Sequence, residues 1–183
     1  PPLYKVKHGK NEYYLKDDYS LNQYLLKLAL QGASLTLHEG ETLDVAVLES
    51  LAKEYVLSDA IIHRLSVTML PEVLYAVLNG ALLDLSSEEA TRITMVQLDA
   101  VLKKLYPASG SSGSFNMELL HNEATGTYSI QVQKTQHGHS KFMVITREFL
   151  SSGDYLQLEK TAKLLDGLIK TTATVAKGDK QLV

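Results

Sequence analysis

The sequence predicts an α+β fold in which a β-hairpin and short strands accompany a helical cluster, a three-stranded antiparallel meander and a final long helix. Apolar residues recur at helical spacing over 42–106 and 153–170, and they alternate at strand spacing over 115–146. A Ser/Gly-rich loop at 107–114 separates the helical cluster from the meander. Because the strands come in runs and do not alternate regularly with helices, the pattern favours α+β over a parallel βαβ fold.

A β-hairpin followed by a helix is expected at the beginning of the chain. Two runs rich in tyrosine and valine, 3–8 and 12–16, flank a Gly-Lys-Asn segment in which the glycine permits a tight turn. Apolar residues at helical spacing follow this hairpin. Asp17, Asp18 or Ser20 can cap that helix by accepting a hydrogen bond from a backbone N–H that has no partner within the helix.

The middle of the chain is expected to hold several helices. A short strand at 33–38 and a turn at 39–41 precede a helical pattern that begins at Thr42. Ser58 or Asp59 can cap a second helix in this cluster. A third helix is expected to begin at the proline of a Leu-Pro-Glu sequence, because proline is favoured in the first helical turn.

The helix before the Ser/Gly-rich loop has a capping-box signature. In this motif the hydroxyl of Ser86 and the carboxylate of Glu89 satisfy backbone donors at the start of the helix. Its buried face is expected to include Ile93, Leu98 and Leu102.

Three strands are expected after the loop, with the alternating apolar residues of each forming one face of the sheet. In the last strand this alternation falls on Phe142 and Val144. A His-Gly-His sequence at 137–139 is interpreted as a hairpin tip, because no cysteine or further histidine nearby completes a metal-ligand set. The helix over 153–170 follows, and a terminal strand is expected at 171–176.

Composition excludes several classes of protein. The chain has 183 residues, 45% of them hydrophobic, and no cysteine, which excludes a disulfide scaffold and thiolate chemistry and fits a cytoplasmic protein. No apolar run is long enough to span a bilayer, so no membrane role is expected. The net charge of −3 argues against a dedicated nucleic-acid-binding domain.

The charge is unevenly distributed along the chain. Residues 1–16 carry four lysines and one glutamate, a net charge of +3, so the remaining residues sum to −6. If any part of the chain contacts a phosphate backbone, we expect it to be this beginning. The alternative is that the lysines only keep an edge hairpin from pairing with other strands.

The opening residues also carry a family resemblance. The sequences Pro-Pro-Leu-Tyr-Lys-Val-Lys, Tyr-Tyr-Leu-Lys-Asp-Asp and Asn-Gln-Tyr within 1–25 resemble the B subunit of bacterial DNA gyrase, a type II topoisomerase. Residues 149–155 and 176–180 resemble later parts of the same family. The resemblance implies that 1–38 ends a TOPRIM domain, that 39–172 is the insert domain of Gram-negative gyrases, and that 173–183 begins the return strand to TOPRIM.

The same resemblance implies a parent enzyme that uses ATP and Mg²⁺ to introduce negative supercoils into DNA. Its implied partners are the A subunit of DNA gyrase, double-stranded DNA and the remaining domains of the B subunit, with no membrane. Lys5, Lys7 and Lys10 are the residues expected to lie near DNA phosphates. The insert is expected to act as a noncatalytic scaffold and coupling element.

No catalytic, metal-binding or cofactor-binding residue is expected in this chain. The family's metal motif, a glutamate followed by Gly-Asp-Ser and later by an Asp-x-Asp pair, is absent, and the acids at 17–18, 39–41 and 153–154 are interpreted as helix caps and turn residues. No glycine-rich phosphate cradle is present. The chain begins with proline and stops without a closing helix, so we expect an excised piece that is inactive alone. The alternative is a freestanding protein-interaction module with no enzymatic role.

Overall fold

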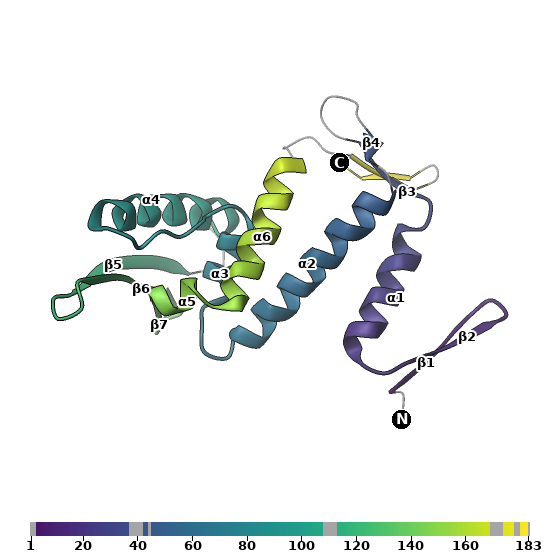
Figure 1. Ribbon diagram of the computed structural model, residues 1–183, viewed down its shortest axis with the longest axis horizontal. Coiled ribbons are helices and arrows are strands. Elements are labelled where there is room, and N and C mark those ends of the chain that lie inside the picture. The colour runs from purple at the N-terminus through teal and green to yellow at the C-terminus, as the bar shows by residue number, and fades with distance from the viewer. Residues whose placement is uncertain are drawn as a thin grey trace. The chain divides into compact units, whose positions relative to one another are not determined.

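The computed structural model forms two compact units, unit 1 (Pro1–Leu57 with Gly167–Val183) and unit 2 (Ser58–Asp166). The residues that it describes are 3–36, 42–43, 45–107, 113–168, 174–177 and 180–182. Its elements are β1 (Tyr4–His8), β2 (Asn11–Leu15), α1 (Asp18–Leu30), β3 (Ala33–Thr36), β4 (Thr42–Leu43), α2 (Val45–Leu65), α3 (Pro71–Leu78), α4 (Glu88–Leu105), β5 (Ser114–Asn122), β6 (Thr127–Gln136), β7 (His139–Ile145), α5 (Arg147–Leu150), α6 (Gly153–Leu168), β8 (Thr174–Lys177) and β9 (Lys180–Leu182). Figure 1 labels all of them except β8 and β9, the two yellow strands. The predicted α+β class is confirmed.

Unit 1 begins with the predicted hairpin, in which β1 and β2 pair antiparallel. Of the three candidate caps for α1, Asp17 takes the role, and its carboxylate accepts a hydrogen bond from Ser20 N at 2.7 Å. Hydrogen bonds from Ser20 hold the pKa of Asp17 below its usual value. No residue of α1 is fully buried within the chain.

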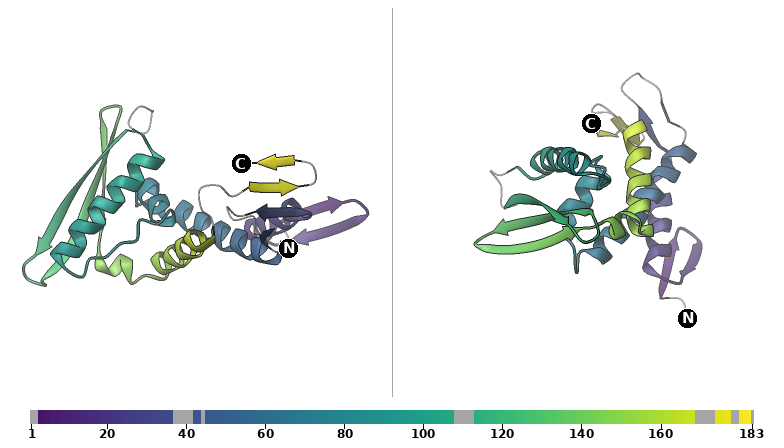
Figure 2. Two further views of the ribbon diagram at one scale, coloured as in Figure 1. Left: turned by 90° about the horizontal axis from the view of Figure 1, so that it is seen from above. Right: turned by 60° about the vertical axis from the view of Figure 1, so that its left-hand side comes forward.

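A four-stranded antiparallel sheet completes unit 1. Its order is β4-β3-β8-β9, so β3 pairs with a strand almost 140 residues later, with Ala33 opposite Lys177 and Thr36 opposite Thr174 (Figure 2). The sequence predicts β3 and β8 but not β9. The predicted turn at 39–41 lies outside the described residues, as do 108–112 of the loop and 169–173 of the last helix and terminal strand.

The prediction of two helices between 42 and 65 is wrong. Thr42 belongs to strand β4, and α2 then continues unbroken past both expected caps. Ser58 is fully buried inside the helix, and its hydroxyl donates to Thr161 Oγ1 at 2.8 Å. The Asp59 carboxylate accepts a hydrogen bond from the Tyr75 hydroxyl at 2.5 Å. These two polar side chains are satisfied by partners on α6 and α3, so neither has to end the helix.

The start of α3 is as predicted, with Pro71 in its first turn, whereas the start of α4 is displaced by one residue. The cap of α4 is Ser87, whose hydroxyl accepts a hydrogen bond from Ala90 N at 3.1 Å. Ser86 is therefore not the cap, and Glu89 is one position too early for the predicted capping box.

Unit 2 packs helices against the predicted antiparallel meander, whose order is β5-β6-β7. Figure 2 shows α4 along one face of this sheet. Its largest fully buried side chains come from four helices, the sheet and the segment between α3 and α4: Ile62, Val73, Leu74, Val77, Leu78, Leu85, Leu98, Leu102, Ile130, Val132, Ile145 and Leu158.

Two expectations about the buried faces of unit 2 are wrong. Ile93 on α4 is 53% exposed, although Leu98 and Leu102 on the same helix are buried as predicted. In β7, Met143 and Ile145 face the core, whereas Phe142 and Val144 are 57% and 44% exposed. These four residues form a continuous apolar run, so alternation cannot assign a face. Pairing with β6 decides it, because Met143 lies opposite Val132 and Ile145 opposite Ile130.

Positive φ angles occur next to the strands of unit 2, among them at the β6–β7 turn and just before β5. His137 and Gly138 join β6 to β7 with φ of 49° and 78°, the two positive values of a type I′ hairpin turn, which confirms the predicted hairpin tip. Gly113, just before β5, has φ of 82°, and a Cβ there would lie 2.4 Å from Thr135 O.

Candidate nucleic-acid interface

The β1–β2 hairpin brings the predicted DNA-contacting lysines together. Lys5 lies opposite Tyr14 in the strand register and Lys7 lies opposite Glu12. Directly opposed residues of an antiparallel pair share a face, so these four exposed side chains form one surface, which we call the lysine face. Lys10 is exposed in the turn between the strands.

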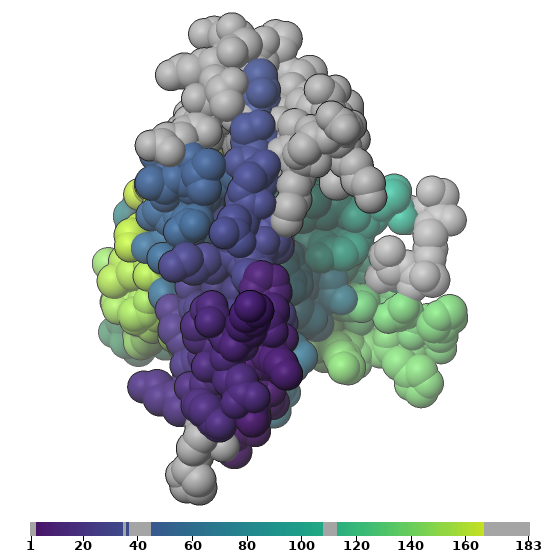
Figure 3. All heavy atoms as spheres, turned by 90° about the vertical axis from the view of Figure 1, so that its right-hand side faces the viewer, coloured from purple at the N-terminus to yellow at the C-terminus, as the bar shows by residue number. Residues whose placement is uncertain are grey.

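The other face of the hairpin is turned toward α1. The Tyr13 ring contacts the Tyr24 ring of α1, with centroids 4.8 Å apart. The Tyr4 hydroxyl donates to the Asp18 carboxylate at the start of α1, and this hydrogen bond raises the pKa of Tyr4 above its usual value. In Figure 3 the hairpin lies next to α1. These contacts orient the lysine face away from the helix.

The lysine face has a net positive charge with one internal ion pair. Lys5 Nζ lies 2.8 Å from Glu12 Oε2 and 5.6 Å from the centroid of the Tyr14 ring. Within the described ranges Lys7 and Lys10 form no ion pair. Lys5, Lys7 and Glu12 give the lysine face a formal charge of +1, and Lys10 in the adjacent turn raises the total to +2.

Such a surface is suited to phosphate contact and contains no acid–base or nucleophilic constellation. Exposed lysines neutralise phosphates, and Tyr14, which is 62% exposed, adds an aromatic ring beside Lys5. Tyr14 and Glu12 were not predicted from the sequence as parts of this surface. The signal that identifies them is the hairpin register, which depends on the turn.

Among the histidines and acids considered from the sequence, those that the structure describes form no metal site, and the acids at 39–41 lie outside the described residues. His137 and His139 lie at the β6–β7 turn, and His63 is exposed on α2. Across the described parts of the chain, no group of three or more His, Asp or Glu side chains could hold a metal ion. The described residues therefore do not supply the carboxylate cluster that a Mg²⁺ site of a topoisomerase needs. None of the described helices has the length and apolar character needed to cross a bilayer.

Comparison with known proteins identifies the family. Residues 33–183 match the DNA gyrase B subunit insert domain, and residues 2–30 match the GyrB hook. The DNA gyrase B subunit of Rickettsia felis is 29% identical over 167 residues, which cover 88% of this chain and 19% of that protein. The DNA gyrase B subunit of Caulobacter vibrioides is 28% identical over 187 residues, which cover 98% of this chain and 21% of that protein.

The chain thus spans about a fifth of the length of these relatives. The insert-domain match covers far more than half of the chain, and a hook match directly precedes it. The chain belongs to the DNA gyrase B subunit insert domain family.

Proposed function

We propose that this chain is the hook and insert part of the B subunit of a DNA gyrase, an ATP-dependent type II topoisomerase that negatively supercoils DNA in the cytoplasm. In this role the chain is a noncatalytic scaffold and coupling element that contacts DNA. Its partners are the A subunit of gyrase, double-stranded DNA and the other domains of the B subunit. The ATP and Mg²⁺ of the parent enzyme bind outside this chain. The family match and the names of the relatives support this proposal.

The observation that carries the DNA contact is the lysine face with the adjacent turn. Lys5 and Lys7 are two positions apart in β1, so their side chains lie on the same face of the hairpin. Lys10 extends the positive surface at the tip of the hairpin. An overall acidic chain approaches DNA most favourably through such a locally basic surface.

Contacts with other protein domains are supported by α1. This helix is rich in leucine and tyrosine, yet Tyr19 and Leu25 are 50% and 48% exposed and no residue of α1 is fully buried. The same observation favours a second candidate function, a freestanding protein-interaction module that has no role in DNA contact.

The test measures binding of a duplex oligonucleotide to the full chain as a function of salt. We expect weak binding that falls with rising salt, and a double variant Lys5→Ala, Lys7→Ala should bind more weakly. Removal of two phosphate contacts reduces the slope of log K against log salt by about 2. A control double variant, Lys53→Ala with Lys104→Ala, removes the same charge from α2 and α4 and should bind like the wild type.

A variant that should strengthen DNA binding provides a further check. Glu12→Gln removes the only acid of the lysine face and releases Lys5, so DNA binding should become tighter. If the lysine double variant and its control bind equally, the hairpin does not contact DNA. If the full chain binds neither DNA nor the remaining part of the gyrase B protein, the freestanding interaction-module function is favoured. ATPase or strand-passage activity of the chain alone would contradict the noncatalytic role.

A further inference from the structure

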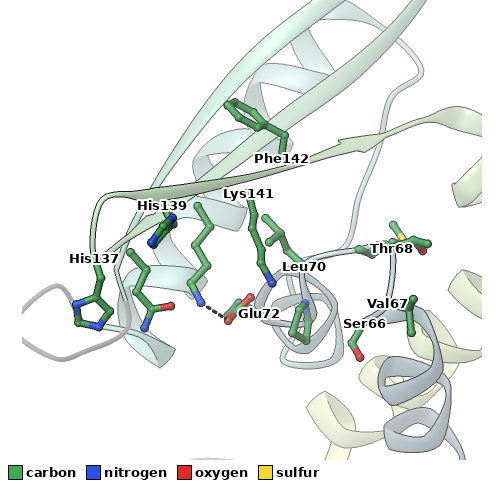
Figure 4. Close-up of a pocket in the computed structure, with 13 residues that line it drawn as sticks. Ser66, Val67, Thr68, Leu70, Glu72, His137, His139, Lys141 and Phe142 are labelled. Carbon is green, nitrogen blue, oxygen red and sulfur yellow. Dashed lines mark hydrogen bonds and ion pairs between the residues drawn. The ribbon is translucent and has the colours of Figure 1, made fainter.

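A pocket of about 750 Å³ lies in unit 2, between the α2–α3 connection and the end of the β6–β7 hairpin. Its lining includes Glu72 at the start of α3, Lys134 and Lys141 on the two strands, and His137 and His139 at the turn. Figure 4 shows Lys141 and Glu72 directed toward the same space, with His139 beside it. Glu72 is the only acid in this lining.

The charges of the pocket are incompletely balanced. Lys134 and Lys141 are directly opposite each other in the strand register, on the face that carries Val132 and Met143. Like charges opposite each other destabilise a sheet. Glu72 compensates one of them, because its Oε1 lies 2.7 Å from Lys134 Nζ and both side chains are largely buried. Lys141 forms no ion pair with any residue that the structure describes. Of the two opposed lysines, Lys141 is therefore the one whose positive charge is not compensated.

Two further features favour an anion in the pocket. His137 and His139 line it, and each carries a ring N–H that can donate a hydrogen bond to a phosphate oxygen. Helix α3 directs its amino end, the positive end of a helix dipole, toward this region, and Leu70 at its cap position supplies no side-chain hydrogen bond.

A cation is the competing occupant, and Glu72 is the residue that favours it. Its Oε2 is buried and has no hydrogen-bond partner among the described residues. One carboxylate oxygen facing two lysines is a poor cation site, because each lysine repels the ion. In addition, the described residues contain no group of three His, Asp or Glu that could hold a metal.

We propose that this pocket binds a phosphate group, with Lys141 as its principal ligand and the two histidines as secondary ones. The volume is large enough for a phosphate-bearing small molecule. The inference concerns unit 2 alone and does not depend on DNA contact by the hairpin.

The main experiment titrates the full chain with pyrophosphate at pH 6.0 and low ionic strength, using calorimetry. Lys141→Gln should weaken binding by roughly 5- to 10-fold, the effect of removing one unit charge a few ångströms from the anion in a partly exposed site. The matched control Lys104→Gln removes an exposed lysine of α4 in the same unit and should leave the affinity unchanged. Absence of binding to the wild type, or equal weakening by both variants, would overturn the proposal.

A charge-neutralising variant separates anion from cation binding. Glu72→Gln keeps an acceptor for Lys134 but removes the negative charge, so it should tighten pyrophosphate binding about 5-fold, and circular dichroism should show an unchanged fold. Weaker binding of pyrophosphate to Glu72→Gln than to the wild type contradicts an anion site.

A competition experiment identifies the source of the phosphate. Pyrophosphate that stays bound in the presence of excess duplex oligonucleotide indicates a small phosphorylated ligand. Displacement that depends on Lys141 indicates the phosphate backbone of a nucleic acid. Either result supports phosphate binding, whereas displacement that is identical in Lys141→Gln contradicts it.

Discussion

Two side-chain hydroxyls, those of Tyr155 and Thr94, hold the irregular segment between α3 and α4 in the core of unit 2. Leu83 N donates to the Tyr155 hydroxyl at 2.9 Å, and the same hydroxyl lies 3.3 Å from Leu83 O. One residue further on, the Thr94 hydroxyl accepts from Asp84 N at 3.0 Å and donates to Asp84 O at 3.1 Å. Because this segment has no strand partner, these two side chains replace the hydrogen bonds that a sheet would supply.

Replacing Tyr155 with phenylalanine should destabilise unit 2. The change leaves Leu83 N–H buried without its acceptor, which costs about 1–3 kcal/mol of unfolding free energy. Urea denaturation measures the loss. Tyr19→Phe, at a half-exposed position on α1, is the control and should leave stability unchanged. Equal stability of Tyr155→Phe and the wild type would show that the hydroxyl does not hold this segment.

The same hydroxyl predicts a dependence of stability on alkaline pH. Burial raises the pKa of Tyr155 above its usual value, while its backbone hydrogen bond with Leu83 lowers it in part. Between the usual tyrosine pKa of about 10 and the raised value, the folded protein retains a proton that the unfolded chain has lost, so the unfolding free energy decreases as pH rises. The stability advantage of the wild type over Tyr155→Phe should therefore be constant below pH 9 and shrink above about pH 10. An advantage that grows above pH 10 would contradict this assignment.

At the scale of elements, the cap of α4 shows how a one-residue ambiguity is resolved. Ser86 and Ser87 are adjacent in the sequence, and only Ser87 accepts a hydrogen bond from the first turn. Ser87→Ala should reduce the unfolding free energy by about 1 kcal/mol, whereas Ser86→Ala should change it little. Thermal or urea unfolding of the two variants measures this difference. The reverse order would assign the cap to Ser86.

Substitution of alanine for two glycines of unit 2 should change the unfolding free energy in opposite directions. Gly138 has φ of 78°, so Gly138→Ala is expected to destabilise the β6–β7 hairpin by about 1–2 kcal/mol. Gly153, the first residue of α6, has no positive φ, and an added Cβ meets nothing within 4 Å. Gly153→Ala should therefore stabilise the protein by up to about 1 kcal/mol. Urea denaturation distinguishes the signs, and destabilisation by both changes would contradict the difference in backbone angle.

Local patterns predicted the elements, and tertiary contacts decided their details. The hairpin, the meander and α4 follow from alternation, turns and helical spacing that short segments carry by themselves. The continuity of α2 through Ser58 depends on Thr161, which lies more than 100 residues away. The inward face of β7 depends on its pairing with β6. The lysines of the candidate site were predicted from local charge together with the family resemblance, whereas Tyr14 beside Lys5 required the strand register.

At the scale of the whole molecule, the two units differ in how much of their structure is internally buried. The fully buried apolar cluster draws on the helices and sheet of unit 2. In the β1–β2 hairpin no residue is fully buried, and two-stranded hairpins are marginally stable by themselves. An exposed hairpin with no fully buried residue is consistent with the proposed role of a contact surface.

Hydrogen exchange should report this difference. We expect backbone amides of β6, whose Ile130 and Val132 are fully buried, to exchange slowest and at the rate set by global unfolding. Amides of β1 and β2 should exchange at least about a hundredfold faster, through local opening. Mass spectrometry of proteolytic fragments provides the measurement. Equal protection of the two regions would mean that the hairpin is stabilised by contacts beyond those described.

Gly113 has a practical consequence for anyone who engineers this protein. The Ser/Gly-rich sequence invites a fluorophore tag or an affinity handle, since its small polar residues have little to bury. Gly113, the final glycine of this sequence, is different, because a Cβ there would clash with the carbonyl oxygen of Thr135 on β6. An inserted peptide should therefore end with this glycine in place, so that β5 still enters the sheet in its native alignment.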